Sequence, residues 1–338
     1  MQLDLKQIES ITSGALQITE GADGIEFFRF TPAQRHLLTQ KDEGFGYKSL
    51  ASSGMRMDFK TNSQHLDIKI RVKNVRARSF FSLEVFVNGK PNGCIDNYSD
   101  LEMPQYYSQT VCPVGEFAGS FDLGKGEKTV TVYLPWNKRT FLQSLCLDDG
   151  AYVEPVRRSK KLLVFGDSIT MGYDALRSSS RYAGRLADFL GAEEFNKAIG
   201  GERFCPDLLE ILEDISPDYI LVAYGTNDWS GKPWADFNDR MTAFFDILAR
   251  KYPNVKTFVV TPVWRPNYQN SKPGYSSFFD VEKSIRQSIA DKENMILIPG
   301  FDMIPHDEKY YADQVLHPND TGFEHYFENL KKQIQKYL

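Results

Sequence analysis

The spacing of apolar residues divides the chain into two parts with different periods. Up to about Pro155 the apolar residues tend to occupy every second position, most clearly from Leu66 to Val72. This alternation is typical of antiparallel strands with one buried and one solvated face. Turn signals such as Asn88-Gly89 separate the strand-like runs. The runs are Phe27–Phe30, His65–Val72, Phe80–Val87, Lys128–Leu134 and Phe141–Leu147.

Beyond Lys160 short apolar runs alternate with segments of helical periodicity. Such alternation predicts strand–helix–strand units, and therefore a parallel sheet covered by helices. The expected strands are Leu162–Phe165, Glu194–Asn196, Tyr219–Ala223, Thr257–Thr261 and Met295–Ile298. The expected helices are Arg181–Leu190, Pro206–Ile215, Trp234–Lys251, Phe278–Lys292 and Asp320–Leu338.

These patterns predict two domains, as does a length of 338 residues, which exceeds the usual size of a single core. Residues 1–155 are expected to form an all-β sandwich resembling a jelly roll, because many short strands with tight turns favour that architecture. Residues 156–338 are expected to form an α/β domain with a doubly wound, flavodoxin-like parallel sheet of five strands. Tyr152–Lys161, which contains a proline and several basic residues, is the expected linker.

A polar cluster follows three of the apolar strands of the second half, and a fourth lies near its end. Because the carboxyl ends of parallel strands meet at one edge of the sheet, we expect these clusters to converge. The clusters are Gly166-Asp167-Ser168, Asn196 to Gly201, Gly225-Thr226-Asn227-Asp228 and Asp313 to Pro318.

The four clusters together carry the groups that acyl transfer needs. A serine hydroxyl needs a base to remove its proton, and His317 is the candidate base for Ser168 because imidazole titrates near neutral pH. The tetrahedral intermediate needs donors for its oxyanion. The backbone N–H groups of Ser168 and Gly201 and the side-chain amide of Asn227 are the expected donors, and glycine allows a close approach of backbone to substrate.

The order of these motifs resembles the four sequence blocks of the SGNH hydrolases, the GDSL-type esterase and acylhydrolase superfamily. The resemblance extends over about Leu162–Leu338 and rests on the four motifs in order, since each alone is weak. It implies Ser168 as nucleophile, Gly201 and Asn227 as oxyanion donors and His317 as base. The sandwich-then-hydrolase order also resembles two-domain acetyl-esterases that deacetylate carbohydrates.

The last block departs from the family pattern, in which an aspartate stands three residues before the histidine. Here Gln314 occupies that position and Asp313 stands four residues before His317. An extra loop residue that still lets Asp313 reach the ring is the interpretation we favour. A Ser–His dyad, with the ring held by a backbone carbonyl, and another acid such as Asp302 are the alternatives.

Aromatic residues in the loops around the expected site indicate what the enzyme binds. Tyr173, Trp229 and Trp264 are candidate substrate-binding residues, because a planar ring suits a sugar as well as an apolar chain. Packing of these rings beneath loops is the alternative interpretation. With no apolar lid segment in view, we expect a short acyl group, most simply acetyl, on a carbohydrate such as a xylo-oligosaccharide. The alternatives are a longer-chain acylhydrolase, such as a lysophospholipase or thioesterase, and an inactive glycan-binding protein.

Composition and charge narrow the choice of partners. A net charge of −5 is too small to favour a nucleic acid or a membrane surface. The four cysteines have no metal-ligand spacing, and no acidic or histidine cluster has one either, so neither a metal nor a cofactor is expected. We find no signal peptide and no apolar run long enough to span a membrane, which predicts a cytoplasmic protein acting on a small-molecule or oligosaccharide ester. The sequence defines no oligomeric state.

Overall fold

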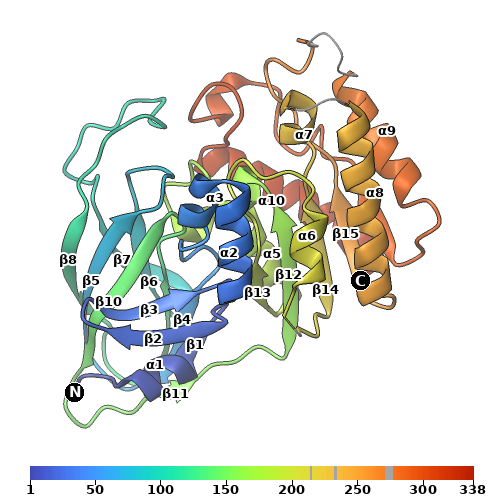
Figure 1. Ribbon diagram of the computed structural model, residues 1–338. Coiled ribbons are helices and arrows are strands. Elements are labelled where there is room, and N and C mark those ends of the chain that lie inside the picture. Colours follow the sequence, from blue (N-terminus) through green and yellow to red (C-terminus); the bar gives the residue numbers. More distant parts are fainter. Residues whose placement is uncertain (214, 232–233, 271–276) are drawn as a thin grey trace.

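Two antiparallel sheets form the first half of the chain in the computed structural model, which describes residues 1–213, 215–231, 234–270 and 277–338 (Figure 1). One sheet contains, in spatial order, β1 (Thr12–Ser13), β4 (Arg56–Thr61), β9 (Lys128–Tyr133), β6 (Ser82–Val87) and β7 (Lys90–Asp96), with β11 (Glu154–Pro155) also on β4. The other contains β2 (Gln17–Gly21), β3 (Gly24–Phe28), β10 (Lys138–Leu147), β5 (His65–Asn74) and β8 (Gly115–Asp122).

Alternating side chains hold the two sheets together. In β5 every second residue from Leu66 to Val72 is buried, as the sequence pattern predicts, and its neighbours are exposed or half-buried. These residues join Met57 and Phe59 of β4 and Val130 and Val132 of β9 in one apolar cluster. The first half is therefore a β-sandwich with its core between the sheets.

Three helices also belong to the first half, and the strand-like pattern does not indicate them. They are α1 (Leu5–Ile11), α2 (Pro32–Lys41) and α3 (Glu43–Lys48). The start of α2 is a capping box in which Thr31 accepts from the backbone of Gln34 and the Gln34 side chain accepts from the backbone of Thr31. Leu38 of α2 packs in a small core with Ile199 and Leu208, so this helix contacts the second half of the chain.

A parallel sheet of five strands forms the centre of the second half. Its order is β13 (Ala192–Asn196), β12 (Lys160–Gly166), β14 (Tyr219–Ala223), β15 (Lys256–Val260) and β16 (Met295–Ile298), which is the flavodoxin-like order 2-1-3-4-5. The expected fold class is confirmed for both halves.

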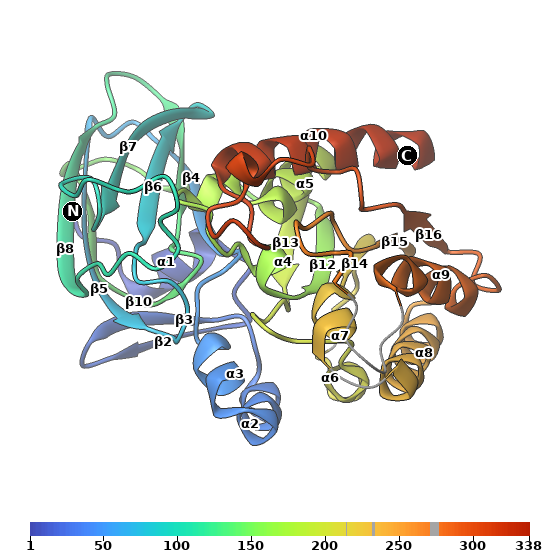
Figure 2. The same ribbon diagram turned by 90° about the horizontal axis from the view of Figure 1, so that it is seen from above.

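Helices cover both faces of this sheet, as Figure 2 shows from above. One face carries α5 (Tyr182–Leu190) and α10 (Asp320–Ile334), packed on Leu162 and Val164 of β12. The opposite face carries α8 (Trp234–Lys251) and α9 (Phe278–Ser288), packed on Leu163 and Phe165, with α6 (Pro206–Glu210) beside α8. The central strands β12, β14 and β15 are thus buried on both sides, which explains their continuous apolar runs, whereas the edge strand β13 alternates buried and half-buried residues.

The two halves share a buried contact beside the sheet. Arg29 is almost fully buried, and its guanidinium donates to the carbonyl oxygens of Asn196 and Ala198 at 3.0 and 2.7 Å. Pro155 is the last residue of the sandwich and Lys160 the first of the parallel sheet. The division of the chain into separate domains at residues 155 and 156 stays a prediction. No helix among the described residues is both long and apolar enough to cross a bilayer.

Candidate active site

Ser168 lies directly beyond the carboxyl end of β12, in the first turn of the short helix α4 (Ser168–Met171). The Asp167 carboxylate caps this helix by accepting from the backbone N–H of Ile169 at 3.0 Å. Gly166 makes the sharp exit from the strand possible, because a Cβ at this position would lie within 2.9 Å of the Ala223 carbonyl oxygen. The turn therefore fixes Ser168 at the edge of the sheet where ligands bind in open α/β folds.

His317 comes from the segment before α10 and meets Ser168 from the other side. The distance between His317 Nε2 and Ser168 Oγ is 2.8 Å, and that between His317 Nδ1 and Asp313 Oδ2 is 2.6 Å. Ser168, which lies 149 residues before His317, thus joins His317 and Asp313 in one continuous hydrogen-bond chain. Its order, hydroxyl to imidazole to carboxylate, is that of a serine hydrolase triad.

The backbone turns between Asp313 and His317, so that Asp313 reaches the ring although it stands four residues before the histidine. Gln314 takes a left-handed conformation with a φ of 61°. The turn lets the second Asp313 oxygen, Oδ1, accept from the backbone N–H groups of Val315, Leu316 and His317 at 2.8 to 3.0 Å. Asp302, the alternative acid, has a side chain that is 88% exposed and pairs with His306 instead.

The three expected oxyanion donors have no acceptor for at least one hydrogen each among the residues that the structure describes. Within the described part of the chain, the backbone N–H groups of Ser168 and Gly201 have no acceptor. Gly201 has a φ of 87°, a conformation that side chains rarely adopt, which explains a glycine here. The side-chain amide of Asn227 uses one hydrogen to hold the Glu202 carbonyl at 3.0 Å and retains a second.

The sequence profile of a known family covers this assembly. Residues 164–325 match the GDSL-like lipase/acylhydrolase family. The second half of the chain is a GDSL-like lipase/acylhydrolase domain. This domain makes the protein an ester-hydrolysing enzyme. No curated protein matches the chain.

Solved structures share the fold along almost the whole chain, sandwich included. Salicylyl-acyltransferase SsfX3 from a tetracycline biosynthetic pathway is 18% identical, with a TM-score of 0.78 over 96% of this chain and 94% of its own. A Bacteroides ovatus protein described as a GDSL-like lipase is 20% identical, with a TM-score of 0.74 over 99% and 97%. The acetyl xylan esterase Est2A from the rumen bacterium Butyrivibrio proteoclasticus is 14% identical, with a TM-score of 0.60 over 99% and 98%. At these identities the likeness concerns the fold.

Burial and hydrogen bonding set the charges of the carboxylates in the acylhydrolase domain. Burial alone would raise the pKa of Asp313, but the hydrogen bonds from the His317 ring and from the backbone outweigh it and lower that pKa. Burial raises the pKa of Asp167 to about 6 and that of Asp228 to about 7. Asp313 is therefore the ionised partner of the ring.

A second carboxylate, Asp174, lies on the same side of the His317 ring, and the sequence analysis does not single it out. Its Oδ2 is 3.8 Å from His317 Nδ1, and Arg78 of the sandwich holds it. Asp174, Asp313 and His317 form a cluster in which one ligand atom of each lies within 4.8 Å of the others. Arg78 already donates hydrogen bonds to the Asp174 carboxylate, and Ser168 is already hydrogen-bonded to His317 Nε2, so both groups have partners within the protein. No local pattern marks Asp174 or Arg78, because their partners lie far away in the sequence.

The three candidate aromatic residues lie near the site but are all buried. Tyr173 packs against the His317 ring at a tilt of 32°, with centroids 5.3 Å apart. Trp229 is 6% exposed and packs on Phe278, while Trp264 is 9% exposed and stacks on His306. Their role in substrate binding stays a prediction.

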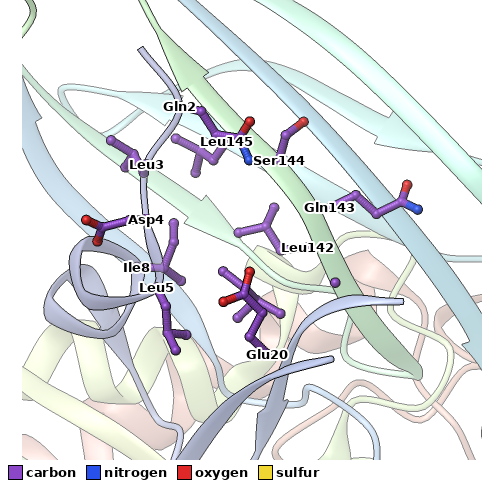
Figure 3. Close-up of a pocket in the computed structure, with 12 residues that line it drawn as sticks. Gln2, Leu3, Asp4, Leu5, Ile8, Glu20, Leu142, Gln143, Ser144 and Leu145 are labelled. Carbon is purple, nitrogen blue, oxygen red and sulfur yellow. The ribbon is translucent and has the colours of Figure 1, made fainter. Parts of the chain in front are cut away.

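A separate cavity of about 340 Å³ lies far from these residues, between the N-terminal segment and β10 (Figure 3). Leucine side chains from both elements line it, together with Ile8, Glu20 and Gln143. None of its lining residues belongs to the predicted site.

Proposed function

We propose that Ser168 is the nucleophile of a serine esterase, with His317 as general base and Asp313 as the acid that orients the imidazole. The observation that carries this proposal is the continuous hydrogen-bond chain of 2.8 and 2.6 Å through the ring. A hydroxyl is a weak nucleophile until a base removes its proton, and the ring is in position to do so.

The reaction proceeds in two balanced half-reactions. Ser168 Oγ attacks the ester carbonyl carbon while its proton moves to His317 Nε2. The negative charge that develops on the carbonyl oxygen is received by the N–H groups of Ser168 and Gly201 and by the Asn227 amide. The intermediate then expels the alcohol, which takes the proton from Nε2 and leaves an acyl–serine ester. Water attacks this ester with the same groups, releasing the carboxylic acid and restoring the hydroxyl.

The proposed substrate is a short acyl ester, most simply an acetyl ester, of a carbohydrate such as a xylo-oligosaccharide. Fold neighbours described as an acetyl xylan esterase and as a family two carbohydrate esterase in complex with cellohexaose support this class. Tyr173, Trp229 and Trp264 are the proposed sugar-contacting residues.

The experiment compares 4-nitrophenyl esters from C2 to C12 with acetylated xylo-oligosaccharides. We expect turnover to fall as the acyl chain lengthens and the Ser168→Ala variant to lose at least about 10³-fold in kcat. Ser178→Ala, which removes another buried serine hydroxyl, serves as the matched control and keeps its activity. Equal hydrolysis by Ser168→Ala and the wild type would refute the assignment.

The alternatives give different results in the same series. A longer-chain acylhydrolase prefers C8 or C12 esters, and an inactive glycan-binding protein binds the oligosaccharide without turning over any ester. The fold is also shared with an acyltransferase. Transfer of the acetyl group to an added sugar, measured against release of free acetate, separates transfer from hydrolysis.

A cytoplasmic location is part of the proposal. All four cysteines are free thiols, which suits a reducing compartment. The proposed partner is a small-molecule or oligosaccharide ester, without a nucleic acid or a membrane.

A further inference from the structure

Asp174 is a buried acid that the proposed mechanism does not use. It follows α4 by a short turn, is fully buried, and has a left-handed backbone with a φ of 69°. A buried carboxylate in such a conformation is costly unless its surroundings hold it. Its position three residues beyond Met171 keeps it on the segment that carries the nucleophile.

The groups that hold Asp174 all come from the sandwich half. Arg78, between β5 and β6, makes a two-pronged contact with Nε on Oδ1 at 2.5 Å and Nη2 on Oδ2 at 2.9 Å. Ser108 Oγ donates to Oδ2 at 2.6 Å, and the Tyr107 hydroxyl donates to the Asp174 carbonyl at 2.7 Å. The loop between β7 and β8 thus closes over the carboxylate from the far side.

The same pair faces the histidine. Arg78 Nη2 lies 3.3 Å from His317 Nδ1, and Asp174 Oδ2 lies 3.8 Å from it. The Arg78 guanidinium also sits over the Tyr173 ring, which in turn packs against the imidazole. The His317 Nδ1 edge is therefore bounded by Asp313 from its own loop and by the Arg78–Asp174 pair from the opposite side.

We propose that the β-sandwich acts on the acylhydrolase centre through Arg78, and that Arg78 and its partner Asp174 are positioning residues that keep the His317 ring hydrogen-bonded to Asp313. The proposal rests on the proposed function for the role of His317. Bound to Arg78 and Ser108, the Asp174 carboxylate is not a competing acceptor for the Nδ1 proton. Asp313 is thus the carboxylate that hydrogen-bonds to His317 Nδ1, and the Tyr173 ring packs against the face of the imidazole.

The charges of Arg78 and Asp174 act on the imidazole, which a contact that only joined the two halves of the chain would not do. The charged or titratable groups around the ring are Asp313, Asp174, Arg78, Tyr173 and, next to the nucleophile, Asp167, with the buried Arg265 interacting with both Asp313 and Asp167. Arg78 and Asp174 cancel each other, so that Asp313 supplies the net charge at Nδ1. Removing either member of the pair leaves the other unbalanced beside the imidazole, and the two removals have opposite signs.

The test measures the pH dependence of serine reactivity from pH 5 to 9. The readouts are kcat/KM for 4-nitrophenyl acetate and the rate at which a fluorophosphonate probe labels Ser168, located by peptide mass. In Arg78→Met the negative charge of Asp174 is no longer balanced and favours the protonated ring. The acidic limb of the pH–rate profile, where activity rises with pH, therefore moves to higher pH by about one unit. In Asp174→Asn the unbalanced Arg78 moves the limb down by a similar amount, and asparagine tolerates the left-handed backbone.

Two further variants isolate positioning from charge and from folding. Arg78→Lys keeps the charge but loses the two-pronged contact, so we expect an unmoved limb and at least a tenfold lower kcat. The double variant Arg78→Met/Asp174→Asn restores charge balance and brings the limb back toward that of the wild type. The matched control is Arg177→Ala, which removes another ion pair between the halves, to Asp96 at 3.1 Å, and leaves the limb in place.

The outcomes separate the two proposals. The positioning role is overturned if Arg78→Met and Asp174→Asn melt at the wild-type temperature yet lose activity with no movement of the acidic limb, or if the limb moves in the same direction in both. If one of these two variants does not fold, a wild-type kcat in Arg78→Lys, or a displaced limb in the double variant, overturns the role instead. A wild-type protein that the probe does not label at Ser168 contradicts the proposed function itself.

Discussion

Replacing Asp313 by asparagine changes one atom at the far side of the histidine and leaves the surrounding turn in place. The remaining side-chain oxygen can still accept from the three backbone N–H groups that Oδ1 holds. The new amide nitrogen faces His317 Nδ1, which must then accept a hydrogen bond. The ring proton moves to Nε2, the atom that should receive the Ser168 proton.

Two effects set the size of the loss. The first is the wrong tautomer, which costs a triad up to about 10⁴-fold in kcat. The second is the lost carboxylate charge, for which Coulomb attraction at about 4 Å with an effective dielectric of 20 is about 4 kcal/mol. Because both act on the same protonated ring they overlap, and we expect kcat to fall about 10³- to 10⁴-fold. KM should change less than about threefold, since Asp313 makes no contact with the ester in the proposed mechanism.

The assay is steady-state hydrolysis of 4-nitrophenyl acetate, with thermal unfolding as a check on the fold. The matched control is Asp302→Asn, which removes the exposed alternative acid. We expect its kcat to equal that of the wild type. If Asp313→Asn keeps more than a tenth of the wild-type kcat, the enzyme works as a Ser–His dyad. If Asp302→Asn alone lowers kcat, Asp302 and not Asp313 is the acid that orients His317.

Two further results are expected. Asn227→Ala removes one oxyanion donor and should lower kcat about 10²- to 10³-fold with little change in KM; a loss below threefold, measured on the same ester, would exclude this donor. Asp228 has a pKa raised by burial to about 7 from 3.8, so the folded state holds its proton longer than the unfolded state and stability falls as pH rises from about 4 to 7. Asp228→Asn cannot ionise and should therefore raise Tm more at pH 8 than at pH 5, and an equal gain at both would show that Asp228 stays charged when folded.

The second half of the chain is predictable from sequence because its central strands are buried on both faces. The strands Tyr219–Ala223 and Met295–Ile298 and the helix Trp234–Lys251 have the bounds that the pattern predicts. Helix ends are less certain, since an apolar pattern continues past the last hydrogen-bonded turn. The helix expected over Pro206–Ile215 ends at Glu210, because Ile211 leaves helical geometry.

The first half is less predictable because several of its elements carry polar residues at buried positions. Strand β4 escapes the pattern since Arg56 and Asp58 are buried as an ion pair of 2.8 Å. Helix α2 is missed although Thr31-Pro32 and Gln34 carry a recognisable capping box. Its apolar surface is too short to give a helical period, and its burial depends on packing against the second half.

The candidate site shows the same division between local and distant information. Three of the four motifs follow a strand, so topology alone predicts that Ser168, Gly201 and Asn227 lie at one edge of the sheet, whereas the position of His317 rests on the order of the motifs. The left-handed Gln314 that brings Asp313 to the ring is a backbone detail without a sequence signature. Arg78 has no motif at all, since its carboxylate partner lies 96 residues further along the chain.

These distant contacts join the sandwich to both ends of the proposed site. On the oxyanion side, Arg29 and Lys48 donate to carbonyl oxygens of the segment that leads to Gly201, including Gly200 at 2.6 Å. On the base side, Arg78 lies 3.3 Å from His317 Nδ1. Side chains of the sandwich thus contact both the segment that leads to Gly201 and the proposed catalytic base, and neither contact has a signature in the sequence of the acylhydrolase domain.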